Sequence, residues 1–306
     1  SGGTLSHDQF VLAVKTIIHG VTMKVLVTGS EGFIGKYVRH ALLQNGHEVI
    51  GMDIVGEPDI KADIALTLDK IPGLDAVIHL AAIANPRECD VNPSKAFVVN
   101  IGATHQVLKM ALASGAKKVV FASSAHVYDI PPRYLPTDEV HSLRLNNTYT
   151  TSKILGEQLC ELFWTNHGLS YTVLRLYNAY GPGQAKGYFI PDMLGKTGDI
   201  DMRTGGHITK DWVWIEDVAR AFLFAVESPF VGPINIGTGI ETPLHVLAGR
   251  IAASKGFVCI TAAKDNATRM QADISRAKKV LGWEPTVAVM EGLERILKAE
   301  RVKVTA

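Results

Sequence analysis

The sequence predicts an α/β fold in which a doubly wound parallel sheet is combined with a smaller, interleaved C-terminal lobe. Three observations support this prediction. Short β-branched runs alternate with helical patterns from Met23 onward, glycines cluster after the first run, and Gly- and Pro-containing loops replace the alternation after about Tyr180. The length of 306 residues is enough for about two domains.

Each expected element follows from local composition. Strands are expected where β-branched and other apolar residues form short runs, at residues 24–28, 48–53, 76–80, 117–123, 170–177 and 233–236. Helices are expected where apolar residues recur three or four positions apart, at residues 35–45, 96–114, 213–227 and 243–255. Gly46 and Gly115 follow the first two helices and favour the backbone conformation that ends a helix.

Composition excludes several classes of function. Lys and Arg total 31 against 30 Asp and Glu, a formal net charge of +1, and like charges form no run. We therefore expect no nucleic acid and no membrane as partners, because those surfaces are bound by clustered cations or apolar spans. Cys89, Cys160 and Cys259 lack the spacing of metal ligands. Reduced thiols, no metal site and a cytoplasmic location are expected.

Residues 1–22 stand apart from the expected fold. Ser1-Gly2-Gly3 resembles a remnant of cloning, and Met23 precedes the first strand as a start residue would. Ser6 and Gln9 have capping-box spacing, so a short helix is expected between there and Gly20. We expect a tag or an upstream extension, and the alternative is a native interaction element.

The first predicted strand runs into the segment Gly29-Ser30-Glu31-Gly32-Phe33-Ile34-Gly35. Gly29 permits a tight turn, Gly32 lets backbone N–H groups approach a pyrophosphate, and Gly35 lets the following helix pack closely on the strand. The spacing GxxGxxG differs from the GxGxxG of the general dinucleotide fingerprint. Its position between a strand and a helix predicts a dinucleotide-binding loop, whereas a plain turn would also favour glycine.

Asp53 ends the second predicted strand. An acid at this place can bond the ribose hydroxyls of an adenosine. No basic residue follows it before Lys61, so the 2′-phosphate of NADP would meet a carboxylate without a compensating cation. We therefore expect NAD rather than NADP, and the alternative interpretation of Asp53 is a solvated acid at a strand end.

Tyr149 and Lys153 form a Tyr-x-x-x-Lys pair, and positions i and i+4 share one face of a helix. An ammonium group beside a phenol favours the phenolate and lowers its pKa, which would let Tyr149 act as a base. Ser123 and Ser124 end the fourth predicted strand, at the edge where open α/β sheets bind ligands. Ser124, Tyr149 and Lys153 are the candidate catalytic residues.

With these motifs the chain resembles the extended short-chain dehydrogenases/reductases, in the NAD-dependent nucleotide-sugar epimerase/dehydratase family that includes UDP-galactose 4-epimerase. The matches run in order from Met23 to about Gly292. Besides GxxGxxG and YxxxK they include Asp63-Ile64, His79-Leu80-Ala81-Ala82, Asn100 and residues 121–128, 174–183, 211–219, 235–239, 272–274 and 281–285.

The resemblance implies a Rossmann NAD-binding domain over residues 23–180 that also receives residues 211–238. Residues 181–210 and 239–300 would form the substrate-binding lobe. A homodimer would form through the helices around residues 96–113 and 153–164. The residues that would contact NAD are Gly29, Gly32, Phe33, Ile34, Gly35, Asp53, Asp63, Ile64, Leu80, Ala81, Ala82, Asn100, Ser123, Tyr149 and Lys153.

The candidate substrate-contacting residues are Ser124, His126, Asn178, Arg203, Lys210 and Arg269. Lys210 stands where the family usually has Arg, which suits a diphosphate better because its guanidinium binds in a bidentate way. Arg203 and Arg269 could supply further cations, although a surface role is an equal alternative for Arg203. For His126, a core or solvated histidine is the alternative.

Details of the motifs distinguish members of the family. Dehydratases place Thr-Asp-Glu where this chain has Ser124-Ala125-His126, so the two carboxylates that assist loss of water are missing. We therefore expect an NAD-dependent nucleotide-sugar 4-epimerase, in which transient oxidation at C4 is reversed by hydride return. The short segment 183–209 supports the alternative, a dehydrogenase of a free sugar acid or other small hydroxy compound. A dehydratase and a non-catalytic NAD-binding protein are less expected.

Overall fold

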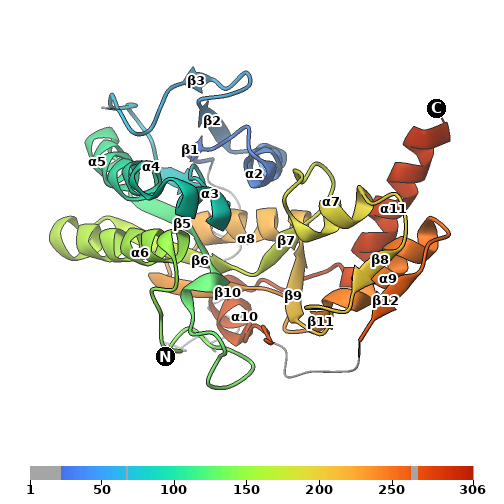
Figure 1. Cartoon of the computed structure of the whole chain (residues 1–306). Coiled ribbons are helices and arrows are strands. Elements are labelled where there is room, and N and C mark those ends of the chain that lie inside the picture. The colour runs from blue at the N-terminus through green and yellow to red at the C-terminus, as the bar shows by residue number, and fades with distance from the viewer. Residues whose placement is uncertain (1–21, 67, 263–267, 306) are drawn as a thin grey trace, which may run out of the picture.

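Seven parallel strands form the main sheet of the protein, shown as a computed structural model in Figure 1. The structure describes residues 22–66, 68–262 and 268–305, and the helix expected before Gly20 lies outside them. The strands are β1 (Lys24–Thr28), β2 (Glu48–Asp53), β3 (Ile60–Lys61), β4 (Ala76–His79), β5 (Lys118–Ser124), β6 (Ser170–Leu176) and β10 (Gly232–Ile236). The six predicted strands are confirmed, each end within one residue, while β3 is too short to give a sequence pattern.

The strand order β10-β6-β5-β4-β1-β2-β3 makes the sheet doubly wound, as predicted. The chain starts at β1, builds outward to β2 and β3, and then returns to β4 on the other side of β1. The carboxyl ends of β1 and β4 therefore border the switch point, where the connections leave toward opposite faces and a crevice for ligands forms.

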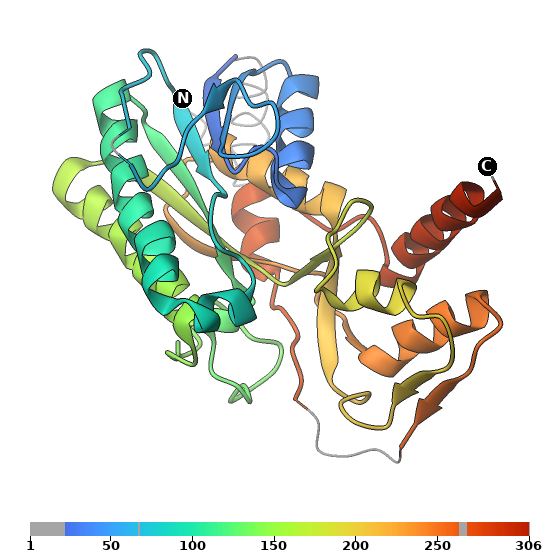
Figure 2. The same cartoon turned by 45° about the horizontal axis from the view of Figure 1, so that its top comes forward.

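Helices cover both faces of the sheet (Figures 1 and 2). The core on one face contains residues of α2 (Phe33–Gln44) and α8 (Ile215–Glu227), and the core on the other contains residues of α5 (Ala103–Ser114) and α6 (Thr148–His167). Alternation along β1 serves both cores, because successive side chains of a strand point to opposite faces. Val25 and Val27 enter the first core, and Leu26 enters the second.

The helix expected over residues 96–114 is present but is not uniform. It consists of α4 (Pro93–Phe97), a π-helical segment η1 (Val98–Gly102) and α5, which ends at Gly115 with φ of 86°. A π segment inserts one residue into the helical ladder and is common at functional sites. This segment turns the side chain of Asn100 into the interior, where it is 2% exposed.

A smaller group of elements lies to one side of the main sheet in Figures 1 and 2. A three-stranded sheet of β7 (Asn178–Tyr180), β9 (Thr209–Trp214) and β11 (Glu241–Pro243) leads into it. The remaining elements are α7 (Phe189–Leu194), β8 (Ile200–Met202), α9 (Leu244–Ser254), β12 (Cys259–Thr261) and α11 (Val289–Thr305), while α10 (Ser275–Leu281) packs near β10. The predicted helix 213–227 begins at Ile215 because Val213 and Trp214 continue β9. In the described ranges, no helix is both long and apolar enough to cross a membrane.

Candidate active site

The glycine turn connects β1 to α2 at the carboxyl edge of the sheet, next to the switch point. Gly29 has φ of 72°, and a Cβ there would lie 2.7 Å from the backbone nitrogen of Ala81. A Cβ on Gly35 would lie 2.1 Å from the carbonyl oxygen of Gly29. Gly32 is the N-cap of α2, and no side chain caps this helix. The turn is therefore a tight cradle that exposes the N-terminal N–H groups of a helix, as an anion requires.

Asp53 lies beside this turn at the end of β2. Its Oδ2 accepts a hydrogen bond from Glu31 N at 2.9 Å, and its Oδ1 accepts from Ile54 N at 2.7 Å and Val55 N at 3.2 Å. A carboxylate has about four acceptor positions, so Oδ2 retains one for a ribose hydroxyl. The Glu31 contact joins Asp53 to the glycine turn.

The other residues expected to contact the dinucleotide differ in whether their side chains are exposed to solvent. Asp63 is exposed and accepts a hydrogen bond from Ala65 N, but the side chain of Ile64 is 5% exposed and packs in the core. Residues 80–82 follow β4 at the switch point, where Leu80 N donates to Thr28 O at 3.1 Å. Ile64 can therefore offer a ligand little beyond its backbone.

The side chain of Asn100 makes hydrogen bonds with other groups in the interior of the protein. Its Oδ1 accepts from Ile83 N at 2.8 Å, and its Nδ2 donates to Ile83 O and to Ser152 Oγ, each at 3.0 Å. Ser152 Oγ in turn donates to the carbonyl of Tyr149. Asn100 thus ties the segment that follows β4 to the first turn of α6, and it acts on the site through these contacts.

Residues at the end of β5 contact residues on one face of α6. Lys153 Nζ donates to the carbonyl of Ala122 at 2.9 Å, Ser123 Oγ donates to Glu157, and Ser124 is hydrogen-bonded to Tyr149. Tyr149, Lys153 and Glu157 are four residues apart along α6, so they form one row on the helix. The three candidate catalytic residues are therefore together, at the carboxyl edge of the sheet. Ser123 points toward Glu157.

Burial dominates the acid–base properties of this group. It raises the pKa of Tyr149 to about 12, although the hydrogen bond with Ser124 opposes the shift. It lowers the pKa of Lys153 to about 8, partly offset by the nearby Cys89 and Glu157. The expected lowering of the Tyr149 pKa by Lys153 is wrong for the protein alone, because the loss of hydration on burial is the largest influence on the phenol and raises its pKa.

Two features of this region were not predicted. The guanidinium of Arg175 on β6 binds both carboxylate oxygens of Glu157, with Nη2 to Oε2 at 2.7 Å, and it also donates to Tyr128 Oη at 3.1 Å. Cys89 is fully buried and packs with Tyr149. Glu157 extends the Tyr149–Lys153 spacing by another four residues, a signal that sequence could have supplied. The contact of Cys89 depends on tertiary packing.

Three of the residues expected to contact a substrate, His126, Asn178 and Lys210, lie on η2 (Ala125–Val127), β7 and β9. Burial and, secondarily, the charge of Lys210 lower the pKa of His126 to about 4, so its imidazole is neutral at pH 7. Burial also lowers the pKa of Lys210. Asn178 donates to the carbonyl of Asp211 at 3.0 Å. The structure thus places His126 near Lys210, although 84 residues separate them in sequence.

The two arginines expected to contact the substrate, Arg203 and Arg269, each form an ion pair with an acidic side chain. Arg203 is exposed and pairs with Asp201, with Nη2 to Oδ2 at 2.6 Å. Arg269 is also exposed, and its guanidinium binds Glu241, with Nε at 3.0 Å from each carboxylate oxygen. Arg269 nevertheless borders a small cavity with Tyr128, Tyr177 and Met270, whereas Arg203 does not.

These residues fit a dinucleotide. The backbone cradle at Gly29 and Gly35 would be filled by any Cβ, the uncapped end of α2 suits a pyrophosphate, and Asp53 retains an acceptor for a ribose. Tyr149 and Lys153 lie across the switch point from this turn, at the end of the adjoining half of the sheet. The arrangement therefore fits a dinucleotide with its adenosine near the end of β2 and its reactive ring near the end of β5.

Comparison with known proteins agrees with this geometry. The sequence pattern described as the NAD dependent epimerase/dehydratase family matches residues 25–237. A putative UDP-glucose 4-epimerase from Methanocaldococcus jannaschii is 33% identical over 298 residues, or 89% of this chain and 97% of the relative. UDP-glucuronic acid decarboxylase 6 from Arabidopsis thaliana is 29% identical over 89% of this chain and 87% of the relative.

Among solved structures, a UDP-glucose 4-epimerase from Thermotoga maritima with UDP-glucose is 29% identical. It superimposes with a TM-score of 0.80 over 92% of this chain and 100% of that chain. The family match spans both the glycine turn and the Tyr149–Lys153 pair, and NAD is the cofactor. The chain therefore belongs to the NAD-dependent epimerase/dehydratase family, within the extended short-chain dehydrogenases/reductases.

Proposed function

We propose that the protein is an NAD-dependent nucleotide-sugar 4-epimerase. The observation that carries this proposal is the grouping of Ser124, at the end of β5, with Tyr149 and Lys153, on one face of α6, at the carboxyl edge of the sheet. Ala125 and His126 follow Ser124 without a carboxylate, which argues against a dehydratase. UDP-glucose 4-epimerases among the relatives support the same class of reaction.

In this proposal the cofactor end of the cleft positions the dinucleotide. The turn around Gly29, Gly32, Phe33, Ile34 and Gly35 holds the pyrophosphate, and Asp53 holds the adenosine ribose. Asp63 and Ile64 border the adenine, and Leu80, Ala81 and Ala82 line the crevice, with Asn100 and Ser123 supporting it. When bound, NAD supplies a positively charged ring that accepts a hydride and can return it.

The chemical step depends on three side chains. Tyr149 takes the proton from the C4 hydroxyl of the sugar, Ser124 donates a hydrogen bond at the reacting oxygen, and Lys153 places an ammonium group beside the phenol. Because burial raises the pKa of Tyr149 to about 12, the phenolate requires additional positive charge in the assembled site. Rotation of the intermediate ketose before hydride return inverts C4.

The smaller lobe would hold the nucleotide. Lys210 is the cation that we propose for the diphosphate, because it is largely buried and its strand leads directly to the site. Asn178 and the neutral His126 would contact the sugar. Asn178 and Lys210 lie on neighbouring strands, β7 and β9, of the three-stranded sheet, and His126 lies on η2 directly after β5.

One observation favours a second candidate, oxidation of a free sugar acid or another small hydroxy compound. Arg203 and Arg269, both considered for a diphosphate, already bind Asp201 and Glu241. A ligand without a diphosphate would need fewer free cations. In that reaction the hydride would remain on the cofactor and the ketone would leave as product.

Proton NMR of the anomeric region distinguishes the two candidates. The protein and NAD are mixed with UDP-, GDP- and dTDP-hexoses and with free uronic acids, while NADH absorbance is followed. A new anomeric signal without net NADH establishes the epimerase. NADH accumulation with a uronic acid, and no change in any nucleotide sugar, would overturn it in favour of the dehydrogenase.

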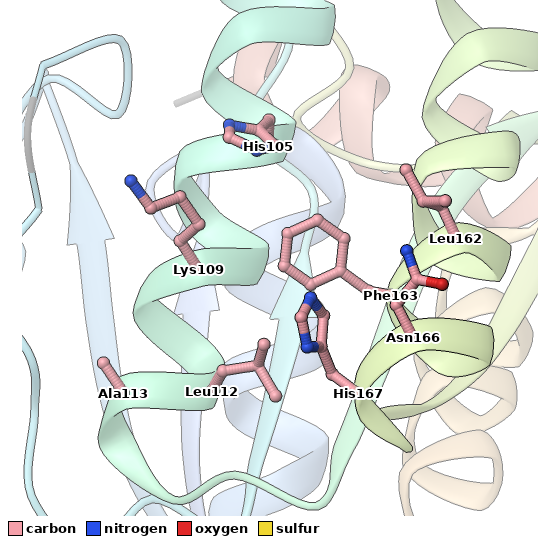
Figure 3. Close-up of a pocket in the computed structure, with 8 residues that line it drawn as sticks. All are labelled: His105, Lys109, Leu112, Ala113, Leu162, Phe163, Asn166 and His167. Carbon is pink, nitrogen blue, oxygen red and sulfur yellow. The ribbon is translucent and has the colours of Figure 1, made fainter.

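We also propose that two copies pair through α5 and α6. A groove of about 710 Å³ lies between these helices, and Figure 3 shows Phe163 at its centre with His105 and His167 beside it. Leu162 is 49% exposed at its edge, next to Leu112 and Phe163 in the lining of the groove, and a contiguous exposed apolar surface is typical of a protein interface. Light scattering should give twice the chain mass, and Leu162→Glu should shift it to one chain mass. An unchanged dimer in that variant would contradict this interface.

A further inference from the structure

The fold brings a cation to the adenosine end of the cleft that the sequence around Asp53 does not contain. The guanidinium of Arg39, on α2, packs against Gly51 of β2, where a Cβ would lie 2.8 Å from Arg39 Cζ. Gly51 and Asp53 are two residues apart, so they face the same side of β2 at a separation of about 7 Å. Arg39 is therefore a neighbour of the carboxylate proposed to bind the ribose.

Two acids hold this guanidinium. Arg39 Nη1 lies 2.9 Å from Glu31 Oε1, and Nη2 lies 2.9 Å from Asp59 Oδ2. Asp59 Oδ2 also accepts from Gly51 N at 2.6 Å, which fixes the acid on the strand. The side chain of Arg39 is only 22% exposed. The Arg39–Glu31 pair is thus partly shielded from water, since the Glu31 side chain is 16% exposed, whereas the Asp59 side chain is 50% exposed.

Glu31 connects this ion pair to the cofactor turn. Its backbone N–H donates to Asp53 Oδ2, and its side chain lies under Gly56, where a Cβ would be 2.8 Å from Glu31 Cγ. Lys36 lies 3.9 Å from Glu31 but is 63% exposed, so solvent screens it. Glu31 stands between the pyrophosphate turn and the loop after β2.

We propose that Glu31 and Asp59 determine the preference for NAD over NADP by holding Arg39 in a two-acid ion pair. A 2′-phosphate carries nearly two negative charges and would need a cation at this end of the cleft. Arg39 is close enough in the fold to serve, but it already neutralises two carboxylates. A phosphate would therefore meet Asp53 and Glu31 while the Arg39 guanidinium is already neutralised, and its rejection would involve more than Asp53.

The test is direct binding of NAD⁺ and of NADP⁺ by isothermal titration calorimetry, which needs no sugar substrate. The inference rests on the cofactor of the family and is independent of which reaction the enzyme catalyses. The variants are Glu31→Gln, Asp59→Asn and the double variant Glu31→Gln/Arg39→Gln. Glu57→Gln is the matched control, because Glu57 is an exposed acid on the same loop and its substitution changes the net charge equally.

Glu31→Gln should tighten NADP⁺ binding by about fivefold or more while the NAD⁺ Kd changes by less than about threefold. Asp59→Asn should act in the same direction. Removing Arg39 as well should cancel the gain for NADP⁺, and Glu57→Gln should leave the ratio of the two affinities unchanged.

Three results would overturn the proposal. The first is an unchanged NADP⁺ to NAD⁺ affinity ratio in both Glu31→Gln and Asp59→Asn. The second is a gain that survives the loss of Arg39, since net charge alone would then explain it. The third is equal weakening of both cofactors in the single variants, which would make the acids general supports of the turn.

Discussion

The proposed cofactor end and the proposed substrate end of the site differ in how their polar groups are satisfied. At the cofactor end, the side chains of Asp53 and Asn100 are hydrogen-bonded to backbone groups of neighbouring segments. At the substrate end, the imidazole of His126 and the ammonium of Lys210 are buried enough to have lowered pKa values. The first arrangement is prepared by the fold alone, whereas the second uses groups whose charge and hydrogen bonds a ligand can complete.

This difference indicates which end of the site can change its ligand specificity without loss of the fold. The cofactor end depends on backbone geometry, so a substitution there affects folding and NAD binding together. The substrate end depends on a few side chains carried by short strands and turns, so it can be altered without loss of the fold. The predictions below separate the two ends and the catalytic row between them.

The largest effect is expected from Tyr149→Phe, which removes the proposed base and leaves the ring packed with Cys89. Turnover should fall by a factor of about 10²–10⁴. The Kd for NAD should change much less than turnover, because the ring of Tyr149 and the other residues expected to contact NAD remain. Tyr134→Phe, on an exposed side chain, is the control and should retain activity. Turnover near that of the unmodified protein would exclude Tyr149 as the base.

Glu157→Gln should destabilise the protein most, because it leaves the guanidinium of Arg175 buried without its carboxylate. The side chains of Arg175 and Glu157 are 5% and 10% exposed, and breaking such a pair costs about 3–5 kcal/mol of unfolding free energy. Urea denaturation measures the loss. Glu161→Gln, on an exposed position of the same helix, should change it by less than about 0.5 kcal/mol. Equal effects of the two variants would show that the pair is unimportant.

Lys210→Ala should act only at the substrate end. The KM for the nucleotide sugar should rise about tenfold, which corresponds to loss of one charge-assisted hydrogen bond, while the Kd for NAD stays constant. Lys210→Arg should restore binding, and Lys186→Ala, at an exposed position, is the matched control. An altered Kd for NAD with an unchanged KM for the nucleotide sugar would contradict the proposed role of Lys210 in substrate binding.

The smallest effect is expected in the pH dependence of the unfolding free energy. It is tested with one histidine from each proposed end of the site, His79 and His126. Burial lowers the pKa of His79 to about 3 and contributes most to lowering that of His126 to about 4. The unfolded chain binds these protons near pH 6.5, so the stability that the neutral forms contribute is complete above that pH and is lost as the pH falls toward the folded values.

Each histidine should contribute up to about 1.4 kcal/mol per pH unit to the slope of unfolding free energy below pH 6.5. His126→Gln should reduce that slope with little change at pH 7.5. His79→Gln should reduce it too, but should also lower stability at pH 7.5, because His79 bonds both Thr28 and Thr104. Slopes equal to that of the unmodified protein in both variants would contradict the lowered pKa values.

Sequence periodicity by itself determined six of the seven strands of the main sheet. The six predicted strands are rich in β-branched residues over a length that local composition can reveal, and Gly115 marks a helix end through a conformation that few other residues adopt. The candidate catalytic spacing is local as well, because a helix places residues i and i+4 on one face. Tyr149 and Lys153 could therefore be paired before their surroundings were known.

Only the tertiary structure decided which charges meet. Arg39 lies 14 residues before Asp53 in sequence and on a different element, and its pairing with Glu31 and Asp59 follows from how α2 packs on β2. The direction of the Tyr149 pKa shift depends on burial, which no spacing rule supplies. Long-range electrostatics and desolvation depend on distances through space, and a sequence pattern reports distances only along the chain.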